Sequence, residues 1–420
     1  MDTRPIFEND AIVFGLLMLI LGFVFYTSSR KTGFWGFFYK YIPALLMCYF
    51  IPAILNTFNL IDGETSKVYF IASRYLLPAA LVLMTLSINL KAIANLGYKA
   101  LIMFATGTIG IIIGGPIAIL LISLVSPDTV GGADFDAVWR GLTTIAGSWI
   151  GGGANQAAML EIFQYNPQKF SSMVVVDIFV ANTWMAILLL GIGKSKKIDK
   201  WLKADNSAIE ILKQKVSTFS EKIKRNPTLS DYMIMLGLAF AAVGLAHLGS
   251  GLIAGELESI AAFTNKESAL SSFTSTFFWM ITIATICGIL LSFTKAKNYE
   301  GAGASKLGII FIYILVASIG MQMNLLDIFD NPGLIAVGFV WMSIHAGLLI
   351  LVAKLIKAPY FFLAVGSQAN VGGAASAPVV AAEFHPSLAS VGVLLAVLGY
   401  VVGTYGAIAC AWLMEIAAAS

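Results

Sequence analysis

The chain has 420 residues, of which 58% are hydrophobic and 12% are charged, and its mean hydropathy is +0.85. A soluble domain carries about twice that share of charged residues, so the composition excludes a soluble protein. The formal net charge of +3 is close to neutral and gives no sign of a nucleic-acid partner. The three cysteines, Cys48, Cys287 and Cys410, lie in apolar segments without metal-ligand spacing, which predicts packing thiols.

Apolar runs long enough to cross about 30 Å of hydrocarbon recur along the chain. The first follows an acidic, polar start without a basic region or cleavage site, which predicts a retained helix and not a signal peptide. Hydropathy predicts ten spans, near residues 11–28, 41–58, 68–90, 98–125, 170–193, 232–249, 270–293, 305–324, 331–356 and 388–416. Residues 139–165 and 359–384 are also apolar, but glycine clusters interrupt them.

One clearly hydrophilic segment, residues 194–230, separates a first half, 1–193, from a second half, 231–420. It contains ten Lys or Arg residues against four acidic ones, and basic segments favour the cytoplasmic side of a membrane. Its apolar residues Ile209, Ile211, Leu212 and Val216 have lysines between them. This pattern fits either an amphipathic helix on the membrane surface or a solvated linker.

Three features recur in the same order in the two halves. Leu86–Ile93 matches Met321–Ile328, Gly147–Gln156 matches Gly366–Ser376, and Glu161 with Asn166-Pro167 matches Glu383 with His385-Pro386. Basic loops predict that span 68–90 runs from outside to inside, while its partner 305–324 runs from inside to outside. We therefore predict an all-α integral membrane protein, an inverted repeat of two five-helix halves with both termini outside.

Each half also contains one glycine-rich segment, predicted as a re-entrant hairpin. A hairpin that returns to its own side leaves the basic linker in the cytoplasm, in agreement with every other loop. A broken helix that crosses the membrane is the alternative, and it requires a further crossing between the halves.

Backbone that unwinds at membrane depth persists only where protein or a polar cavity satisfies its N–H and C=O groups. Two hairpin tips that meet near the midplane would surround one site with half-helix N-termini, free carbonyls and polar side chains. The candidate substrate-binding residues are Ser148, Gly151, Gly152, Gly153, Asn155, Gln156, Ser367, Gln368, Asn370, Gly372, Gly373 and Ser376. The alternative is that these glycines only permit close helix packing.

Asp177 lies within a predicted span, where a carboxylate needs a partner, a proton or a bound cation. Asn182 and Thr183 follow about one and two turns along, and Thr404 is the repeat-related counterpart of Thr183. We predict that these four residues hold the coupling ion, Na⁺ or H⁺. A structural carboxylate that pairs with a buried cation or a backbone donor is the alternative.

Other ionisable residues allow two interpretations each. Arg74 either snorkels to the outer interface or contacts a substrate carboxylate, and His345 either relays protons or packs through hydrogen bonds. Glu161 and Glu383, at the bases of the hairpins, either gate the site or are solvated. The sequence contains no metalloprotease, paired-cysteine or phosphate-binding motif, so we expect no enzyme and no cofactor beyond the coupling ion.

The chain resembles the domain-of-unknown-function family 819, multi-pass proteins of bacteria and plastid-bearing organisms, over nearly its whole length. More distantly, it is similar to sodium–glutamate and 2-hydroxycarboxylate symporters, whose two inverted halves each carry a hairpin tipped by Gly-Gly-x-Gly. Here the tips read Gly151-Gly152-Gly153-Ala154 and Gly372-Gly373-Ala374-Ala375, so alanine replaces the final glycine and substrate identity does not carry over. The resemblance implies tips that hold solute and Na⁺ between a scaffold and a mobile domain, and a homodimer.

These features together predict a secondary active transporter in the bacterial cytoplasmic (inner) membrane. Its partners would be the lipid bilayer and a small anionic or zwitterionic solute, such as an amino acid, a dicarboxylate or a short peptide. A cation/proton antiporter without an organic substrate and an ion channel are the alternatives. A membrane assembly factor is a further alternative, because no residue in the sequence identifies a substrate.

Overall fold

The computed structural model describes residues 5–30, 32–42, 44–63, 65–86, 93, 96–205, 207, 209, 225–260, 273–326, 331–385 and 388–419. These residues form helices, and their only extended pairing is an isolated bridge between Phe7 and Ile61. Most of the repeat-related motif Leu86–Ile93, the end of its partner Met321–Ile328 and the linker from 210 to 224 lie outside this set. The predicted all-α class is confirmed.

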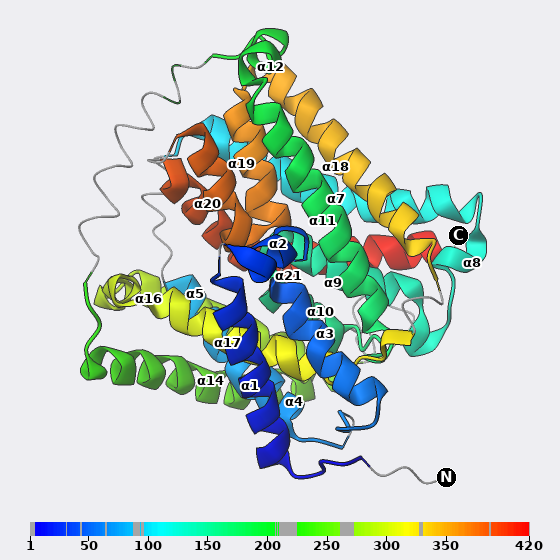
Figure 1. The fold of residues 1–420 in the computed structure, drawn as a ribbon, viewed down its shortest axis with the longest axis vertical. Coiled ribbons are helices and arrows are strands. Elements are labelled where there is room, and N and C mark those ends of the chain that lie inside the picture. The colour runs from blue at the N-terminus through cyan, green and yellow to red at the C-terminus, as the bar shows by residue number, and fades with distance from the viewer. Residues whose placement is uncertain are drawn as a thin grey trace.

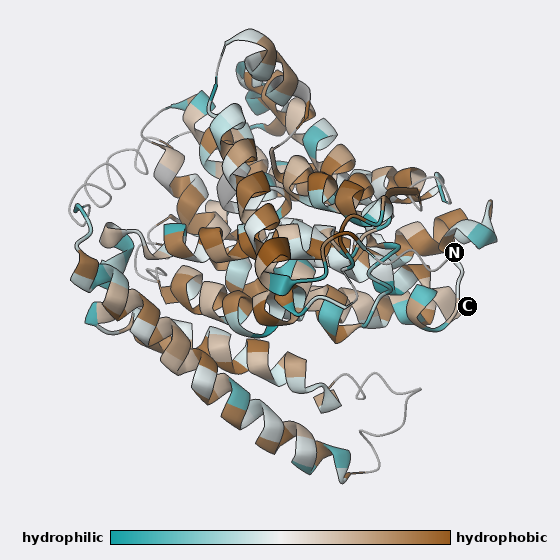
Figure 2. Ribbon diagram, turned by 60° about the horizontal axis from the view of Figure 1, so that its bottom comes forward, coloured by the Kyte–Doolittle hydropathy of each residue, from teal (hydrophilic) through white to brown (hydrophobic). Residues whose placement is uncertain are grey.

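Seven helices among the described residues are long and apolar enough to cross a membrane, or up to nine if two bent helix pairs count as spans. Figure 2, coloured by residue hydropathy, shows many hydrophobic residues (brown) along the helices. The predicted spans near 41–58, 270–293 and 305–324 form helices of only 14, 17 and 17 residues. The prediction of a multi-pass membrane protein is confirmed, whereas the inverted repeat stays a prediction.

The long helices pack into two groups (Figure 1). We call the first the flanking bundle; it comprises α1 (Asp10–Ser28), α3 (Ala44–Thr57), α4 (Val68–Ile71), η1 (Ala72–Leu76), α5 (Leu77–Leu86), α14 (Leu229–Glu258), α16 (Thr276–Ser292) and α17 (Ala304–Gly320). The second, the hairpin bundle, comprises α7 (Tyr98–Ser123), α9 (Val138–Gly151), α10 (Gly153–Ile162), α11 (Phe170–Ile192), α18 (Leu334–Leu355), α19 (Tyr360–Val371), α20 (Gly373–Phe384) and α21 (Ala389–Ala419). Helices contact each other mainly within their own bundle.

Shorter helices connect these elements. They are α2 (Gly33–Tyr41), α8 (Pro127–Val130), η2 (Asp134–Asp136), α12 (Ser195–Leu202) and η5 (Lys295–Ala302). The helix α12 begins the basic linker, whose next residues dock on the hairpin bundle. There the ammonium of Lys99 lies 3.2 Å from Asp205 Oδ2, and hydrogen bonds led by Ser207 lower the pKa of Asp205 to about 2.

Each glycine-rich segment folds back on itself. In hairpin 1 (α9 and α10), Arg140 Nη1 donates to the carbonyl of Phe163 over 2.7 Å, which joins the two ends of the segment. In hairpin 2 (α19 and α20), the ring of Phe384 lies 5.3 Å from that of Phe361. Both segments therefore end beside the point where they begin, which is the geometry of a hairpin, while their course through a membrane stays a prediction.

The two hairpins pack against one helix, α21. A side chain at Gly399 would meet the carbonyl oxygens of Ile150 in hairpin 1 and Ala369 in hairpin 2, at 2.8 and 3.4 Å from its Cβ. Gly392 likewise lies against the backbone of Ala377, where a Cβ would approach the carbonyl oxygen to 2.4 Å. Small residues thus let the backbone of α21 reach the backbone of both hairpins.

We predict that Gly392→Ala lowers the thermal stability of the purified protein, because the added methyl group meets backbone atoms that cannot rotate away. Overpacking of this kind costs about 1–3 kcal/mol. The control is Gly244→Ala on α14, where a Cβ would meet no atom within 4 Å. There alanine should be neutral or stabilising by up to about 1 kcal/mol. Equal melting temperatures for the two variants would contradict the close approach of α21 to hairpin 2.

Candidate functional site

The carboxylate of Asp177, on α11, lies inside hairpin 1. Its side chain is 6% exposed, Trp149 Nε1 donates to Oδ1 over 2.7 Å and Gln156 Nε2 donates to Oδ2 over 2.9 Å. The Ser148 hydroxyl is a third donor. All three are neutral, and Asp177 forms no ion pair among the described residues. A buried carboxylate held only by neutral donors is suited to bind a cation or a proton.

The break between α9 and α10 explains why these donors converge. Gly152 has a φ of +81°, a left-handed backbone conformation that favours glycine, and its N–H closes α9 on the carbonyl of Ser148. The chain then reverses, so Trp149 in the last turn of α9 and Gln156 in the first turn of α10 reach the same carboxylate. Sequence analysis did not identify Trp149 as a site residue, although it directly follows the candidate residue Ser148.

Asparagine satisfies the backbone near each hairpin break in the same way. Asn155 Nδ2 donates to the carbonyl of Gly151 over 2.9 Å, and its Oδ1 accepts from Thr404 on α21 over 2.7 Å. In hairpin 2, Asn370 Nδ2 donates to the carbonyl of Gly366 over 2.9 Å, and its Oδ1 accepts from Thr108 on α7 over 2.7 Å.

Thr404 therefore contacts a hairpin and not Asp177, and its structural counterpart is Thr108. Sequence analysis paired Thr404 with Thr183 and did not identify Thr108. The sequence could have indicated Thr108, because it is a hydroxyl residue between two glycines in an apolar span.

Asn182 and Thr183 do not join Asp177. Asn182 Nδ2 donates to the carbonyl of Ile178, and the Thr183 hydroxyl donates to that of Phe179, each four residues back on the same helix. At about 100° per residue, positions five and six after Asp177 point away from its face of the helix. Of the four predicted ion-coupling residues, the structure leaves Asp177 alone with the donors of hairpin 1.

Ser367, near the end of α19, belongs to a buried chain of side chains. Trp184 Nε1 lies 2.8 Å and His345 Nε2 lies 2.9 Å from its hydroxyl oxygen. His345 Nδ1 lies 3.0 Å from the carbonyl of Gly107, and because a carbonyl only accepts, Nδ1 carries the proton. In the neutral histidine, Nε2 then accepts from Ser367, which accepts from Trp184.

Gln368 differs from the other amides of the two tips. Its Oε1 accepts from Ser376 on α20 over 2.7 Å, but its Nε2 is buried without a hydrogen-bond partner. The residue is 1% exposed. Beside it, Gly372 lies close enough to the Gln368 and Ser376 side chains to exclude a Cβ, while a Cβ at Gly373 would meet no atom within 4 Å. Hairpin 2 therefore contains one buried donor without a partner, and Gly373 separately leaves room for a side chain.

Among the described residues, hairpin 1 also forms most of the polar contacts between the two bundles. Gln156 Oε1, beside Asp177, accepts from the hydroxyl of Tyr49 on α3 over 3.2 Å. Glu161 at the base of α10 pairs with Arg74 on η1 over 2.8 Å and accepts from the Tyr69 hydroxyl. Glu383, its repeat-related counterpart, is exposed. The matched glutamates thus have different surroundings.

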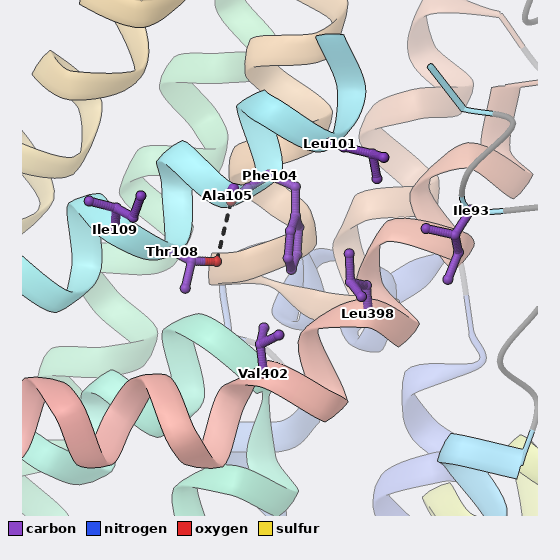
Figure 3. Close-up of a pocket in the computed structure, with 8 residues that line it drawn as sticks. All are labelled: Ile93, Leu101, Phe104, Ala105, Thr108, Ile109, Leu398 and Val402. Atoms are coloured by element: carbon purple, nitrogen blue, oxygen red, sulfur yellow. Dashed lines mark hydrogen bonds between the residues drawn. The ribbon is translucent and has the colours of Figure 1, made fainter. Parts of the chain in front are cut away.

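An apolar pocket of about 500 Å³ lies between α7 and α21 (Figure 3). Figure 3 shows Phe104 and Thr108 of α7 facing Leu398 and Val402 of α21 across this space. Its lining is Ile93, Leu101, Phe104, Ala105, Thr108, Ile109, Leu398 and Val402. The described residues contain no cluster of His, Cys, Asp and Glu that could hold a metal ion through three or more such ligands.

We predict that Trp149→Phe lowers the melting temperature more than Trp341→Phe. Both indoles are fully buried and lose one hydrogen bond, but Trp149 donates to a carboxylate and Trp341 donates to the carbonyl of Ile111. Hydrogen bonds to charged groups are worth about 1.5–3 kcal/mol, against about 0.5–1.5 for neutral pairs. The difference in melting temperature between the two variants should shrink as acid protonates Asp177. Thermal unfolding over a pH series measures this difference. Equal losses at every pH would contradict an ionised Asp177.

Comparison with known proteins agrees with the membrane architecture. A Bacillus subtilis (strain 168) protein described as uncharacterized membrane protein YjcL is 27% identical over 361 residues, covering 81% of this chain and 82% of that protein. The family model described as protein of unknown function (DUF819) matches residues 15–416. Since this match spans nearly the whole sequence, the chain belongs to the DUF819 family.

Proposed function

We propose that the protein is a secondary active transporter of a small anionic or zwitterionic solute, coupled to Na⁺ or H⁺. The observation that carries the proposal is the Asp177 carboxylate, buried among membrane-length helices and held by donors from both arms of a helical hairpin. A carboxylate in such a place is expensive for a structural role, and it is the usual means by which a carrier binds a cation or a proton.

The division into two bundles supports movement of one against the other. Among the described residues, polar contacts between the bundles gather at hairpin 1 and the start of α11, while hairpin 2 packs against α7, α9, α11 and α21 of its own bundle. Interfaces with few contacts permit rigid-body motion more readily than a continuous core. A shift of the hairpin bundle along the flanking bundle would expose the site to each side of the membrane in turn.

A cation/proton antiporter without an organic substrate is the second candidate. It is favoured because Asn155, Gln156 and Asn370 already use both amide atoms in internal hydrogen bonds. Such an antiporter needs only the carboxylate and its access paths. The unused donor of Gln368 favours a solute instead.

We further propose the bacterial inner membrane as the location, with the basic linker on the cytoplasmic side. The support is the excess of Lys and Arg in residues 194–230, since short basic segments are retained in the cytoplasm. The resemblance to symporters is the basis for expecting a homodimer.

The test is thermal unfolding of the purified protein in NaCl and in choline chloride, across a pH series, for wild type and Asp177→Asn. A ligand that binds only the folded state stabilises it by about 2.7 kcal/mol at a hundredfold excess over its dissociation constant. We expect either a Na⁺-dependent or a pH-dependent stabilisation that Asp177→Asn abolishes. The control, Asp128→Asn at an exposed position of the short helix α8, should keep the wild-type response.

Each outcome selects one interpretation. A Na⁺ response that is lost in Asp177→Asn supports sodium coupling, and a pH response that is lost supports proton coupling. If Asp177→Asn responds to both variables as wild type does, Asp177 is a structural carboxylate and the coupling proposal fails.

A further inference from the structure

One charged contact joins the two bundles. Arg74 Nη2 donates to Glu161 Oε2 over 2.8 Å, and the hydroxyl of Tyr69 donates to the other oxygen of the same carboxylate. Arg74 lies in the helical segment Val68–Leu86, which is long and apolar enough to cross a membrane, and Glu161 lies at the base of hairpin 1. Of the ion pairs between described residues, this is the one that connects the flanking bundle to the hairpin bundle.

The backbone of Arg74 is fixed within the flanking bundle. Pro78, four residues later, has no N–H group, so the carbonyl of Arg74 lacks its usual helical donor. His247 Nε2 on α14 lies 2.9 Å from this oxygen and, because a carbonyl only accepts, donates to it. Arg74 also lies in the π-helical turn η1, and such turns are frequent at functional sites. The backbone is thus held by α14, while the side chain reaches the hairpin bundle.

The guanidinium of Arg74 makes only part of its possible contacts with Glu161. Nη2 bonds the carboxylate, whereas Nη1 is buried without a hydrogen-bond partner among the described residues. The charged group also lies over the ring of Phe277 on α16, 4.5 Å from its centre. Strong arginine–carboxylate pairs form two parallel hydrogen bonds, and buried ion pairs add little net stability compared with apolar packing. A pair with one bond and a spare donor therefore suits a contact that opens and closes.

The flanking bundle holds hairpin 1 through its second arm, α10. Gln156 near the start of α10 meets Tyr49 of α3, and Glu161 near its end meets η1. Between these points α10 packs on α5, α16 and α17. The main contacts of α19 and α20 are instead with the hairpin bundle and α12. The flanking bundle therefore grips one hairpin and not the other.

The two halves of the sequence differ in the same way. By the spacing of the matched motifs Leu86–Ile93 and Met321–Ile328, Ile309 takes the place of Arg74 in the second half. Glu383, the counterpart of Glu161, is exposed. An ion pair equivalent to Arg74–Glu161 cannot form at these positions, so this contact is specific to hairpin 1.

We propose that the Arg74–Glu161 ion pair is a latch that holds the hairpin bundle in its described position and opens when this bundle shifts along the flanking bundle. The inference rests on the proposed transport function and assigns control of its movement to one contact. Both residues act on the position of the bundles and not on the solute. Because Gln156 bonds both Asp177 and Tyr49, the arm that contacts the coupling carboxylate is also the arm that the latch holds.

A cysteine near the latch can report whether the bundles part. Ala157 is 2% exposed and precedes Glu161 by about one turn on the same face of α10, so a cysteine there should react with N-ethylmaleimide only when the interface opens. Ala381 in hairpin 2 is also buried and provides a matched reporter away from the flanking bundle. Each cysteine is introduced into the purified full chain, with Cys287, the one native cysteine that is only partly buried, replaced by alanine.

We expect Glu161→Gln to raise the rate of modification at position 157 by about tenfold or more, as for the loss of a hydrogen bond between charged groups, and to leave position 381 unchanged. Arg74→Gln should do the same. The double variant should react no faster than the faster single variant, because both changes open one contact. The control, Asp136→Asn, breaks a 2.8 Å ion pair with Lys169 that does not join the bundles, and should leave both rates unchanged.

Three results would overturn the latch. An unchanged rate at position 157 in Glu161→Gln would mean that the ion pair does not hold the interface. Equal acceleration at positions 157 and 381 would mean that the pair supports the fold as a whole. A double variant whose acceleration equals the product of the two single effects would mean that Arg74 and Glu161 act separately.

This measurement needs neither a solute nor a coupling ion, so its outcome is separable from the test of Asp177. If the latch variants behave as expected but Asp177→Asn responds to Na⁺ and pH as wild type does, the latch stands and the coupling proposal fails. If the response to Na⁺ or pH depends on Asp177 but Glu161→Gln leaves the rate at position 157 unchanged, the latch alone is rejected.

Discussion

A helix that stops inside a bilayer leaves backbone groups that lipid cannot satisfy, and the architecture of this protein follows from how it meets that constraint. At each break, an asparagine side chain donates to the carbonyl four residues earlier, and a threonine from a neighbouring helix holds the asparagine in place. The arrangement needs close backbone contact, which the glycines of α21 provide. The hairpins, the long helices beside them and the glycine positions therefore form one interdependent unit.

The same constraint separates the roles of the two tips. In hairpin 1, Trp149, Gln156 and Ser148 all donate hydrogen bonds to the Asp177 carboxylate, which would otherwise be buried without solvation. Gln156 also accepts from Tyr49 in the other bundle, so one amide connects the buried charge to the interface between bundles. A change in the occupancy or protonation of Asp177 alters what Gln156 bonds to, and with it the contact across that interface. If Asp177 binds the coupling ion as proposed, this connection provides a physical route from ion binding to the position of the hairpin bundle.

The sequence allowed accurate prediction of some of this structure. Hydropathy was enough for the all-α membrane class, because hydrocarbon thickness acts locally, and the glycine clusters coincide with the breaks between α9 and α10 and between α19 and α20. The partners of those residues were harder to predict. The bonds of Thr108 with Asn370 and of Thr404 with Asn155 join residues more than 200 positions apart, and no local pattern specifies them. The expectation that Asn182 and Thr183 join Asp177 failed for a simpler reason, since helical periodicity directs them to other faces.

The placement of α21 has a consequence for biosynthesis. Hairpin 1 is complete by Ile162, but the helix against which its tip packs begins only at Ala389, close to the C-terminus. The tip of hairpin 1 contacts Gly399, Gly403 and Thr404 of α21. More than half of the chain must be synthesised after hairpin 1 before these contacts can form. Until then the hairpin is poorly suited to lipid and must remain near water or a chaperoning surface. The packing of its tip therefore follows the synthesis of α21, and loss of this helix would disrupt a site encoded in the first half of the chain.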